Sequence, residues 1–349
     1  MPKGHAKAFT AGAKALCRTT YLTGAGDKPT AMPRLEGQAR PRTGATMPSD
    51  TGPATSTATP ARAALTIDVE EWFHSYNVKG VISRKDWDAC ASRVEHTTMQ
   101  MLKILANSNV RATFFVLGWV AEKHPSLVKK IASAGHEIAS HGYNHEPVYS
   151  LSPQEFRSDI LRSKHYLEDL IGSTVQGYRA PCFSITDWAL PILEKAGFAY
   201  DSSAVPTVRH DRYGSLTNMD AAQPITYVCD ELVEVCISCL RFGKRGLPWG
   251  GGGYFRLLPY WLWMRGVHSI LDQGLPYVFY THPWEIDADQ PHVPGMTAAN
   301  RFRQRVNLGS CHDKFRLLVG AFDWKLLGDL CKAWKEQLAS ETMGARVIQ

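Results

Sequence analysis

The chain has 349 residues and a formal net charge of +6 at pH 7, from 39 Lys and Arg against 33 Asp and Glu. Residues 1–63 hold nine of the basic residues and three of the acidic ones, so the remaining 286 residues balance at 30 against 30. The basic character therefore belongs to the amino-terminal segment. The rest of the chain gives no charge argument for nucleic-acid or membrane binding.

Residues 1–63 are rich in Ala, Thr, Gly and Pro and show neither a helical nor a strand period. Such a composition cannot bury a hydrophobic core, so we expect a disordered extension or a leader there. The segment lacks the long apolar run of a secretory signal, and an over-extended start upstream of Met47 is an alternative to a targeting peptide. We expect a folded domain over 64–335 and a tail over 336–349.

Eight cysteines are scattered without the spacing of a disulfide framework, which fits a reducing compartment. Cys236 and Cys239 have redox or zinc spacing, but on a strand residues three apart point to opposite faces, so we interpret them as packing residues. No apolar stretch is long enough to span a bilayer, because 257–264 is interrupted by Pro259. We therefore expect a cytoplasmic location, with the inner membrane face as an alternative setting.

Beyond the amino-terminal segment, short apolar strands alternate with amphipathic helices. The predicted strands cover 64–67, 111–118, 136–140, 175–178, 198–200, 232–237 and 277–280. The predicted helices cover about 83–105, 125–134, 152–171, 187–196 and 258–273. The clearest helix start has a capping Ser152 with Glu155 three residues later. This alternation indicates parallel pairing, so we predict an α/β fold, a distorted (β/α)7-type barrel with an irregular insert around 203–255.

Two histidines four residues apart, His141 and His145, follow the predicted strand 136–140. Such a pair alone is more often loop sequence than a metal site, but Gly142 and Asn144 suit a tight turn that brings both rings to one side. Imidazole nitrogens suit zinc and similar divalent ions, and a catalytic site takes three protein ligands and leaves one position open. We expect a carboxylate from elsewhere in the chain as the third ligand.

Other polar residues also follow predicted strands. They are Asp68, Glu70 and Glu71 after the first strand, Arg179 after the fourth, Asp201 after the fifth, and His282 and Glu285 after the last. In barrels of this kind, reactive side chains gather at the carboxyl ends of the strands. Five strands that deliver ionisable groups to one rim predict an active site there.

These motifs resemble those of the polysaccharide deacetylase family, which shares the NodB homology domain. The resemblance rests on the residues at 66–70, 140–145, 179–181 and 280–284 and covers about 64–318. The phrases at 177–181, 200–203, 251–259 and 282–287 are similar to the subgroup found in exopolysaccharide gene clusters of exosortase-bearing bacteria. The resemblance implies a metal-dependent N-deacetylase on a distorted barrel, acting on N-acetylated sugars.

The resemblance implies these roles: Asp68 as catalytic base, His141 and His145 as metal ligands, and His282 as catalytic acid. One position departs from the family pattern, because the second of two adjacent aspartates, a metal ligand, is replaced by Val69. Residues two apart on an extended segment face the same way, so Glu70 is the expected metal ligand, with Glu71 as the alternative.

Two further residues are expected to support the base and the acid. We predict that Arg179 orients Asp68 and keeps it ionised, and that Asp201 raises the pKa of His282. The alternative for Arg179 and Asp201 is a buried ion pair that braces the barrel rim.

Four residues are expected to contact the substrate. The backbone N–H of Cys182, just after Pro181, is predicted to stabilise the tetrahedral oxyanion together with the metal. Tyr178 and Trp284 are predicted to wall the acetyl pocket or to stack on a sugar. The alternative is that these aromatic residues only pack beside the barrel core.

The predicted function is therefore metal-dependent removal of N-acetyl groups from amino sugars of a polysaccharide, in exopolysaccharide biosynthesis or modification. We expect zinc as the metal and an N-acetylated carbohydrate as the partner, without nucleic acid or an integral membrane segment. Two alternatives stay open: a metal amidohydrolase on a small amide, which a tight closed pocket would favour, and a catalytically silent carbohydrate-binding protein.

Overall fold

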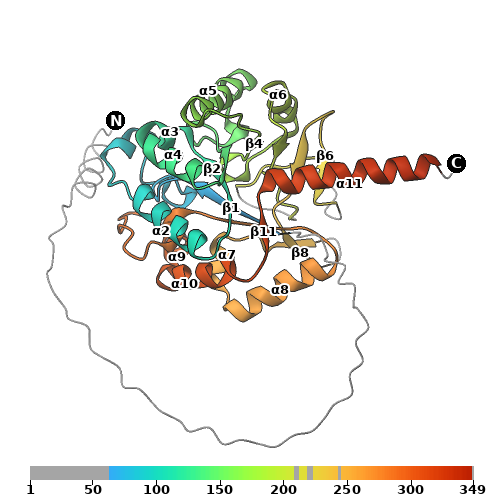
Figure 1. Ribbon diagram of the computed structural model, residues 1–349. Helices are drawn as coiled ribbons and strands as arrows, with labels where there is room; N and C mark the ends of the chain where they lie inside the picture. Colours follow the sequence, from blue (N-terminus) through green and yellow to red (C-terminus); the bar gives the residue numbers. More distant parts are fainter. Residues whose placement is uncertain (1–62, 208–211, 218–222, 243–244, 348–349) are drawn as a thin grey trace, which may run out of the picture.

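The computed structural model describes residues 63–207, 212–217, 223–242 and 245–347 (Figure 1). The extension predicted over 1–63 lies outside the described residues, apart from Ala63. The tail predicted over 336–349 continues a helix, α11 (Leu327–Val347), which projects from the body of the molecule in Figure 1.

Among the described residues, seven parallel strands form the centre of the fold, and each lies where the sequence predicted a strand. They are β1 (Ala63–Val69), β2 (Thr113–Val116), β3 (Glu137–Ser140), β4 (Gly177–Tyr178), β5 (Tyr200–Asp201), β7 (Val233–Val235) and β10 (Tyr277–Thr281). They are ordered β10-β1-β2-β3-β4-β5-β7 across the sheet. The predicted α/β architecture, a distorted (β/α)7-type barrel, is confirmed.

Alternation along β1 separates the two faces of this sheet. Leu65, Ile67 and Val69 pack in the main hydrophobic cluster with the helices. Successive side chains of a strand point to opposite faces, so Thr66 and Asp68 point into the barrel. Asp68 is also close to the carboxyl end of β1, so its carboxylate lies near the carboxyl rim of the barrel.

Helices cover the outside of the sheet (Figure 1). They include α2 (Val94–Asn107), α3 (Gly118–Lys123), α4 (Pro125–Ser133), α5 (Pro153–Ile171), α6 (Leu190–Lys195), α7 (Gly252–Leu257), α8 (Tyr260–Asp272), α9 (Ala298–Arg305) and α10 (Leu308–Val319). The helix predicted over 83–105 is divided: a 3-10 turn, η2 (Arg84–Ala89), precedes α2. The chain leaves the helical path between them because the Arg93 amide donates to the Glu71 carboxylate.

The sheet curls without closing, since no ladder among the described residues joins β7 to β10. Within the predicted insert, β6 (Ile225–Tyr227) pairs with β7 in antiparallel fashion, and β8 (Cys239–Phe242) pairs with β9 (Arg245–Pro248). The glycine run that follows β9 then covers the free edge of β10. The insert is therefore the element that spans the gap.

The glycines at 250–253 make a tight turn against β10. The carbonyl of Gly250 accepts from the Tyr280 amide at 2.7 Å. Gly251 has φ +143°, and a Cβ there would lie 1.9 Å from the Tyr280 carbonyl oxygen, so no other residue fits. Cys236 and Cys239, before and at the start of β8, are free buried thiols, in agreement with a packing role.

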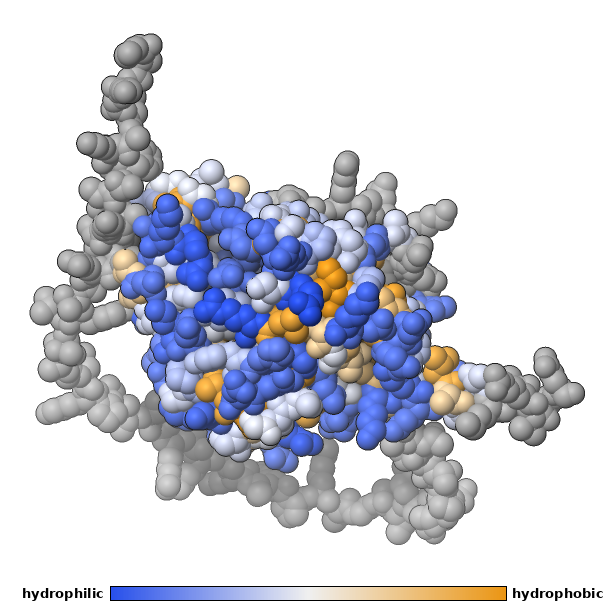
Figure 2. All heavy atoms as spheres, turned by 90° about the horizontal axis from the view of Figure 1, so that it is seen from above, coloured by the Kyte–Doolittle hydropathy of each residue, from blue (hydrophilic) through white to orange (hydrophobic). Residues whose placement is uncertain are grey.

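No helix among the described residues is both long and apolar enough to cross a membrane. Seen from above, the described surface is largely hydrophilic, and a group of hydrophobic side chains is exposed near its centre (Figure 2).

Candidate active site

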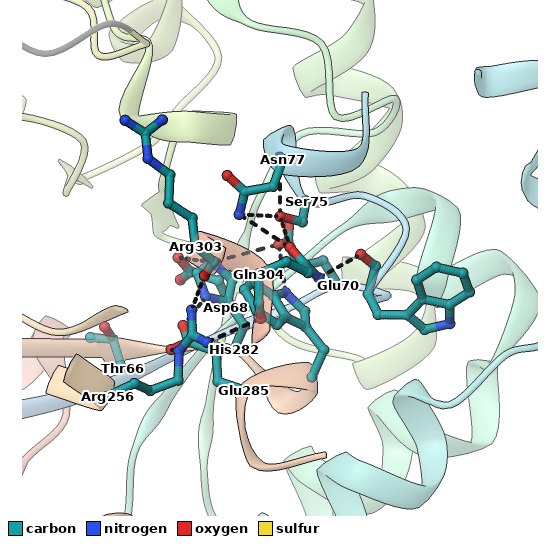
Figure 3. Close-up of polar contacts among 12 residues, drawn as sticks. Thr66, Asp68, Glu70, Ser75, Asn77, Arg256, His282, Glu285, Arg303 and Gln304 are labelled. Carbon is teal, nitrogen blue, oxygen red and sulfur yellow. Dashed lines mark hydrogen bonds and ion pairs between the residues drawn. The ribbon is translucent and has the colours of Figure 1, made fainter. Parts of the chain in front are cut away.

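Most of the site residues predicted from the sequence meet in one cavity of about 380 Å³. Its floor holds Asp68 and Glu70 from the end of β1, His141 and His145 after β3, and His282 after β10. Figure 3 shows Asp68, Glu70 and His282 facing one another. The carboxyl ends of three strands therefore deliver these groups to one point, as the barrel arrangement predicts.

Glu70, His141 and His145 form a cluster that fits a metal ion. One ligand atom from each residue lies within 4.8 Å of the other two. Glu70 Oε2 is 2.5 Å from His145 Nε2 and 3.9 Å from His141 Nε2. That oxygen is buried and accepts no hydrogen bond from the described residues. A buried oxygen without a donor, facing two ring nitrogens, is the environment that a bound cation satisfies.

The hydrogen bonds around the cluster orient its atoms. His141 Nδ1 lies 2.9 Å from the Arg179 carbonyl oxygen, which can only accept, so Nδ1 carries the proton and Nε2 presents a lone pair. Burial lowers the pKa of His141 to about 4, so the ring is neutral at pH 7. Trp284 Nε1 donates to Glu70 Oε1 at 3.1 Å and leaves Oε2 turned towards the histidines.

The charge state of Glu70 also suits a ligand. Burial by itself raises its pKa, but the nearby rings of His145, His282 and His141 outweigh burial and hold the pKa well below its usual range. A carboxylate that stays ionised is the form that binds a divalent ion.

The structure separates Glu70 from Glu71, the alternative ligand. Glu71 points away from the histidines, and its carboxylate accepts from the Ser92 hydroxyl and the Arg93 amide at the start of α2. Position 71 faces the opposite side from positions 68 and 70, as an extended segment requires. Glu71 is thus tied to the beginning of a helix.

The turn that carries the two histidines is held by Asp159 on α5. Its carboxylate accepts from the amides of Tyr143 at 2.7 Å and Asn144 at 3.0 Å. Gly142 has φ +71° and His145 has φ +56°, a left-handed conformation that is unfavourable for a non-glycine residue. The sequence analysis did not identify Asp159, because it lies in a regular helical pattern without a local motif.

Arg179 contacts Asp68 directly. Its Nη1 donates to Asp68 Oδ1 at 2.7 Å and to Thr66 Oγ1 at 2.8 Å, and its other nitrogens donate to the carbonyl and hydroxyl of Ser202. Both charged groups are buried. The second oxygen of Asp68, Oδ2, lies 3.9 Å from His282 Nε2, on the cavity side.

His282 is paired with Glu285. Its Nδ1 lies 2.6 Å from Glu285 Oε1, and Glu285 Oε2 accepts from Arg256 Nε at 2.9 Å. The ring stacks on Trp284, with centroids 5.1 Å apart. Burial by itself lowers the pKa of His282, but the Glu70, Glu285 and Asp68 carboxylates raise it to about 9. A histidine protonated at pH 7 can donate a proton.

The prediction that Asp201 raises the pKa of His282 is wrong. Asp201 is fully buried opposite Glu234 in the adjacent strand, and its Oδ1 accepts from the Ser203 hydroxyl. β5 pairs with β4 and β7, not with β10, so Asp201 and His282 do not follow neighbouring strands. Glu285 takes the predicted role of Asp201 and could have been found by its spacing, three residues after His282 in the 3-10 turn η6 (Pro283–Ile286).

Asp201 and Glu234 form a buried acid pair. Asp201 Oδ2 and Glu234 Oε2 are buried and have no hydrogen-bond partner among the residues that the structure describes. Burial, and then the neighbouring carboxyl group, raises the pKa of Asp201, and burial likewise raises the pKa of Glu234. Two adjacent buried carboxyl groups cannot both ionise readily, so the pair keeps a proton to higher pH than two separate carboxyl groups would.

The acid pair predicts a pH-dependent stability. Because the pKa values are raised in the folded state, stability is present at low pH and is lost as pH rises above the unfolded carboxyl pKa, about 4. Glu234→Gln keeps an acceptor for the Ser203 and Ala204 amides and removes the shared charge. We expect this variant to be about 1–3 kcal/mol more stable than the wild type at pH 8 and little changed at pH 5.

Denaturant unfolding at both pH values measures this difference. Glu231→Gln, an exposed neighbour on the same segment, is the control and should unfold like the wild type. Equal destabilisation of Glu234→Gln at pH 5 and pH 8 would contradict a shared proton.

Of the four predicted substrate contacts, Trp284 and Cys182 line the cavity. Cys182 has φ +56°, and no acceptor among the described residues is bonded to its amide, which leaves that N–H available to a ligand. Tyr178 packs between Phe156 and Phe198, so the packing alternative holds for it. Its ring points outwards because the next residue along the strand, an arginine, points into the barrel.

Pro181 does not contact the cavity either. It packs beside Gly142, where an added Cβ would lie 3.7 Å from the proline ring. Pro181 belongs to the 179–181 motif because of its place in this turn. Its contribution is to hold the backbone next to Cys182.

The geometry defines the class of protein: an open α/β barrel whose rim carries a Glu–His–His group that could hold a metal ion, an arginine-bound aspartate and a glutamate-bound histidine. Two family models match the chain. Residues 86–200 match the polysaccharide deacetylase family, and residues 202–332 match a domain of unknown function, DUF3473. The chain therefore contains a polysaccharide deacetylase (NodB homology) domain, followed by DUF3473.

Named relatives agree with this assignment. A peptidoglycan-N-acetylglucosamine deacetylase of Bacillus cereus is 35% identical over 111 residues, which are 32% of this chain and 40% of that protein. A chitooligosaccharide deacetylase of Rhizobium leguminosarum bv. trifolii is 38% identical over 133 residues, 32% of this chain and 62% of the relative. The chain thus spans less than two thirds of either relative.

A solved structure shows the same fold. The crystal structure of a polysaccharide deacetylase candidate from Mycobacterium smegmatis superposes with a TM-score of 0.55 at 21% identity, covering 83% of this chain and 95% of that one. The match extends over both family segments.

Proposed function

We propose that this chain is a metal-dependent hydrolase that removes N-acetyl groups from amino sugars of a polysaccharide. One observation carries the proposal: a single cavity holds the Glu70–His141–His145 cluster between an arginine-bound carboxylate and a carboxylate-bound histidine. The relatives named above, which act on N-acetylated sugars by name, support the substrate class.

The ligand set of two imidazole nitrogens and one carboxylate oxygen favours zinc. A divalent ion held there would polarise the acetamide carbonyl and make an attacking water molecule more acidic. The remaining work falls to the residues of the chain. They must remove a proton from the water, stabilise the negative oxygen of the tetrahedral intermediate and supply a proton to the leaving amine.

We assign these tasks by position. Asp68 accepts the proton through Oδ2, while Arg179 occupies Oδ1 and keeps the carboxylate in place. The Cys182 N–H donates to the developing oxyanion. His282 gives the leaving nitrogen its proton through Nε2, because Nδ1 is engaged by Glu285. Each task therefore has one group at the cavity floor.

We also propose that 64–335 act as one catalytic unit. Asp68 and Glu70 precede the first family segment, and His282 and Glu285 lie in the second. Neither segment alone holds base, metal cluster and acid. The exopolysaccharide role, the cytoplasmic location and the exosortase-associated subgroup remain predictions from the sequence.

Acetate release from N-acetylglucosamine oligomers tests this function. We expect release by the zinc-loaded protein, loss on chelation and recovery when zinc is added back. Asp68→Asn should bind zinc normally and release acetate about 10²- to 10⁴-fold more slowly, the range for a lost general base. A zinc-loaded wild type that releases no acetate from any sugar oligomer would contradict the proposal.

A further inference from the structure

The outer wall of the catalytic cavity is apolar and comes from two helices of the second family segment. Tyr254 and Leu257 on α7 are 38% and 44% exposed, and Phe302 on α9 is 57% exposed. Together with Ala299 and Val306 they line the same cavity as the metal cluster. We call these five residues the apolar shelf.

The shelf is fixed relative to the catalytic acid. Arg256 on α7 donates to the carbonyl oxygens of Arg303, Gln304 and Val306 at 2.8, 3.1 and 3.0 Å, which joins α7 to the end of α9. The same guanidinium donates from Nε to Glu285, the partner of His282 (Figure 3). A molecule on the shelf therefore lies at a defined place beside the floor.

The chemistry of the shelf differs from that of a sugar subsite. Four of its five side chains offer no hydrogen-bonding group, whereas each sugar ring presents several hydroxyls. Two polar lining residues, Ser75 and Asn77, both donate to Gln304 Oε1 on α9 (Figure 3). Single exposed apolar residues are ordinary on a protein surface. A contiguous apolar lining inside a functional cavity, in contrast, marks a binding site for an apolar part of a ligand.

The charge around the shelf is positive. α9 carries Arg301, Arg303 and Arg305 and no acidic residue. Arg212 and Arg303 line the cavity, and its three lining carboxylates, Asp68, Glu70 and Glu285, belong to the groups described above. Charge complementarity thus favours an anionic group between a sugar at the floor and a chain on the shelf.

Resting on the deacetylase function proposed above, we propose that the substrate is an amphiphile, an N-acetylated sugar joined through an anionic link to a hydrocarbon chain. The sugar occupies the floor, and the first carbons of the chain lie on the apolar shelf. A free, fully polar oligosaccharide would leave these exposed side chains without a partner.

Alkyl N-acetylglucosaminides of increasing chain length test the shelf directly, because the sugar stays the same. We expect kcat/KM for acetate release to rise at least about 10-fold from the methyl to the octyl glycoside, since each buried methylene is worth roughly fourfold. Phe302→Ser and Leu257→Ser should each reduce this ratio. Trp261→Ser is the matched control, because Trp261 is 64% exposed but does not line the cavity, and it should keep the wild-type ratio.

Two results would overturn the inference. One is a kcat/KM that is independent of alkyl length but rises with the number of N-acetylglucosamine units, which would make the shelf a sugar platform. The other is a chain-length gain that Phe302→Ser and Leu257→Ser leave intact.

Failure of the enzyme function is distinguishable. If no glycoside releases acetate, calorimetric binding of methyl and octyl glycosides still tests the shelf. Tighter octyl binding that Phe302→Ser abolishes supports it, and equal binding of both glycosides overturns it.

Discussion

Glu70→Ala is expected to remove the bound metal and to lower acetate release by about 10³-fold or more. The cluster has only three ligand groups among the described residues, and loss of the single carboxylate leaves only the two histidine rings to hold a divalent cation. Metal content after dialysis, together with acetate release, measures the effect. Glu70→Asp, one methylene shorter, should retain part of the metal affinity.

Glu71→Ala is the matched control for Glu70. Its carboxylate bonds the start of α2 and does not face the histidines, so the variant should lose about 1–3 kcal/mol of stability and keep its metal. Metal loss in Glu71→Ala with full retention in Glu70→Ala would reverse the assignment of the third ligand.

Glu285→Gln is expected to shift the basic limb of the pH–rate profile to lower pH and to reduce kcat/KM about 10²-fold at pH 8. Activity falls as pH rises through the pKa of His282, because only the protonated ring can supply the leaving amine with a proton. The Glu285 carboxylate helps to raise that pKa to about 9. A bound cation beside Glu70 acts in the opposite sense, so the wild-type limb should lie below 9.

Asp287→Asn serves as the control for Glu285. Asp287 follows in the same loop but pairs with Arg93 and not with His282. We expect reduced stability without a shift of the basic limb. A Glu285→Gln profile with a lower rate but an unshifted basic limb would contradict an effect of Glu285 on the pKa of His282. Glu285 would then only orient the ring.

The sequence was most informative where a local pattern dictates local geometry. Glycines after helices and a capping box at Ser152 located the elements, because caps and turns satisfy backbone groups within a few residues. Period-two alternation likewise placed Asp68 and Glu70 on one side of the first strand and excluded Val69. His141 and His145 were found because their partner is only four residues away.

Residues whose partners come from distant strands were harder to assign. Asp201 follows a strand as His282 does, and nothing local tells which of two carboxylates lies beside the ring. The order of strands decides it: β5 lies next to β7, whereas Glu285 follows β10 together with His282. Tyr178 illustrates the same limit. In a two-residue strand, the side of the sheet to which a side chain points depends on how the neighbouring strands pair.

The sequence by itself predicted the alternating α/β order and the pair of candidate metal histidines, since these depend on spacing along the chain, and the family resemblance implied Asp68 as base and His282 as acid. Only the tertiary structure decided that Glu70 and not Glu71 joins the histidines, that Glu285 and Arg256 support the acid, and that an apolar shelf borders the site. Each of these depends on contacts between segments up to about two hundred residues apart, whose closeness comes from sheet order and not from any local period.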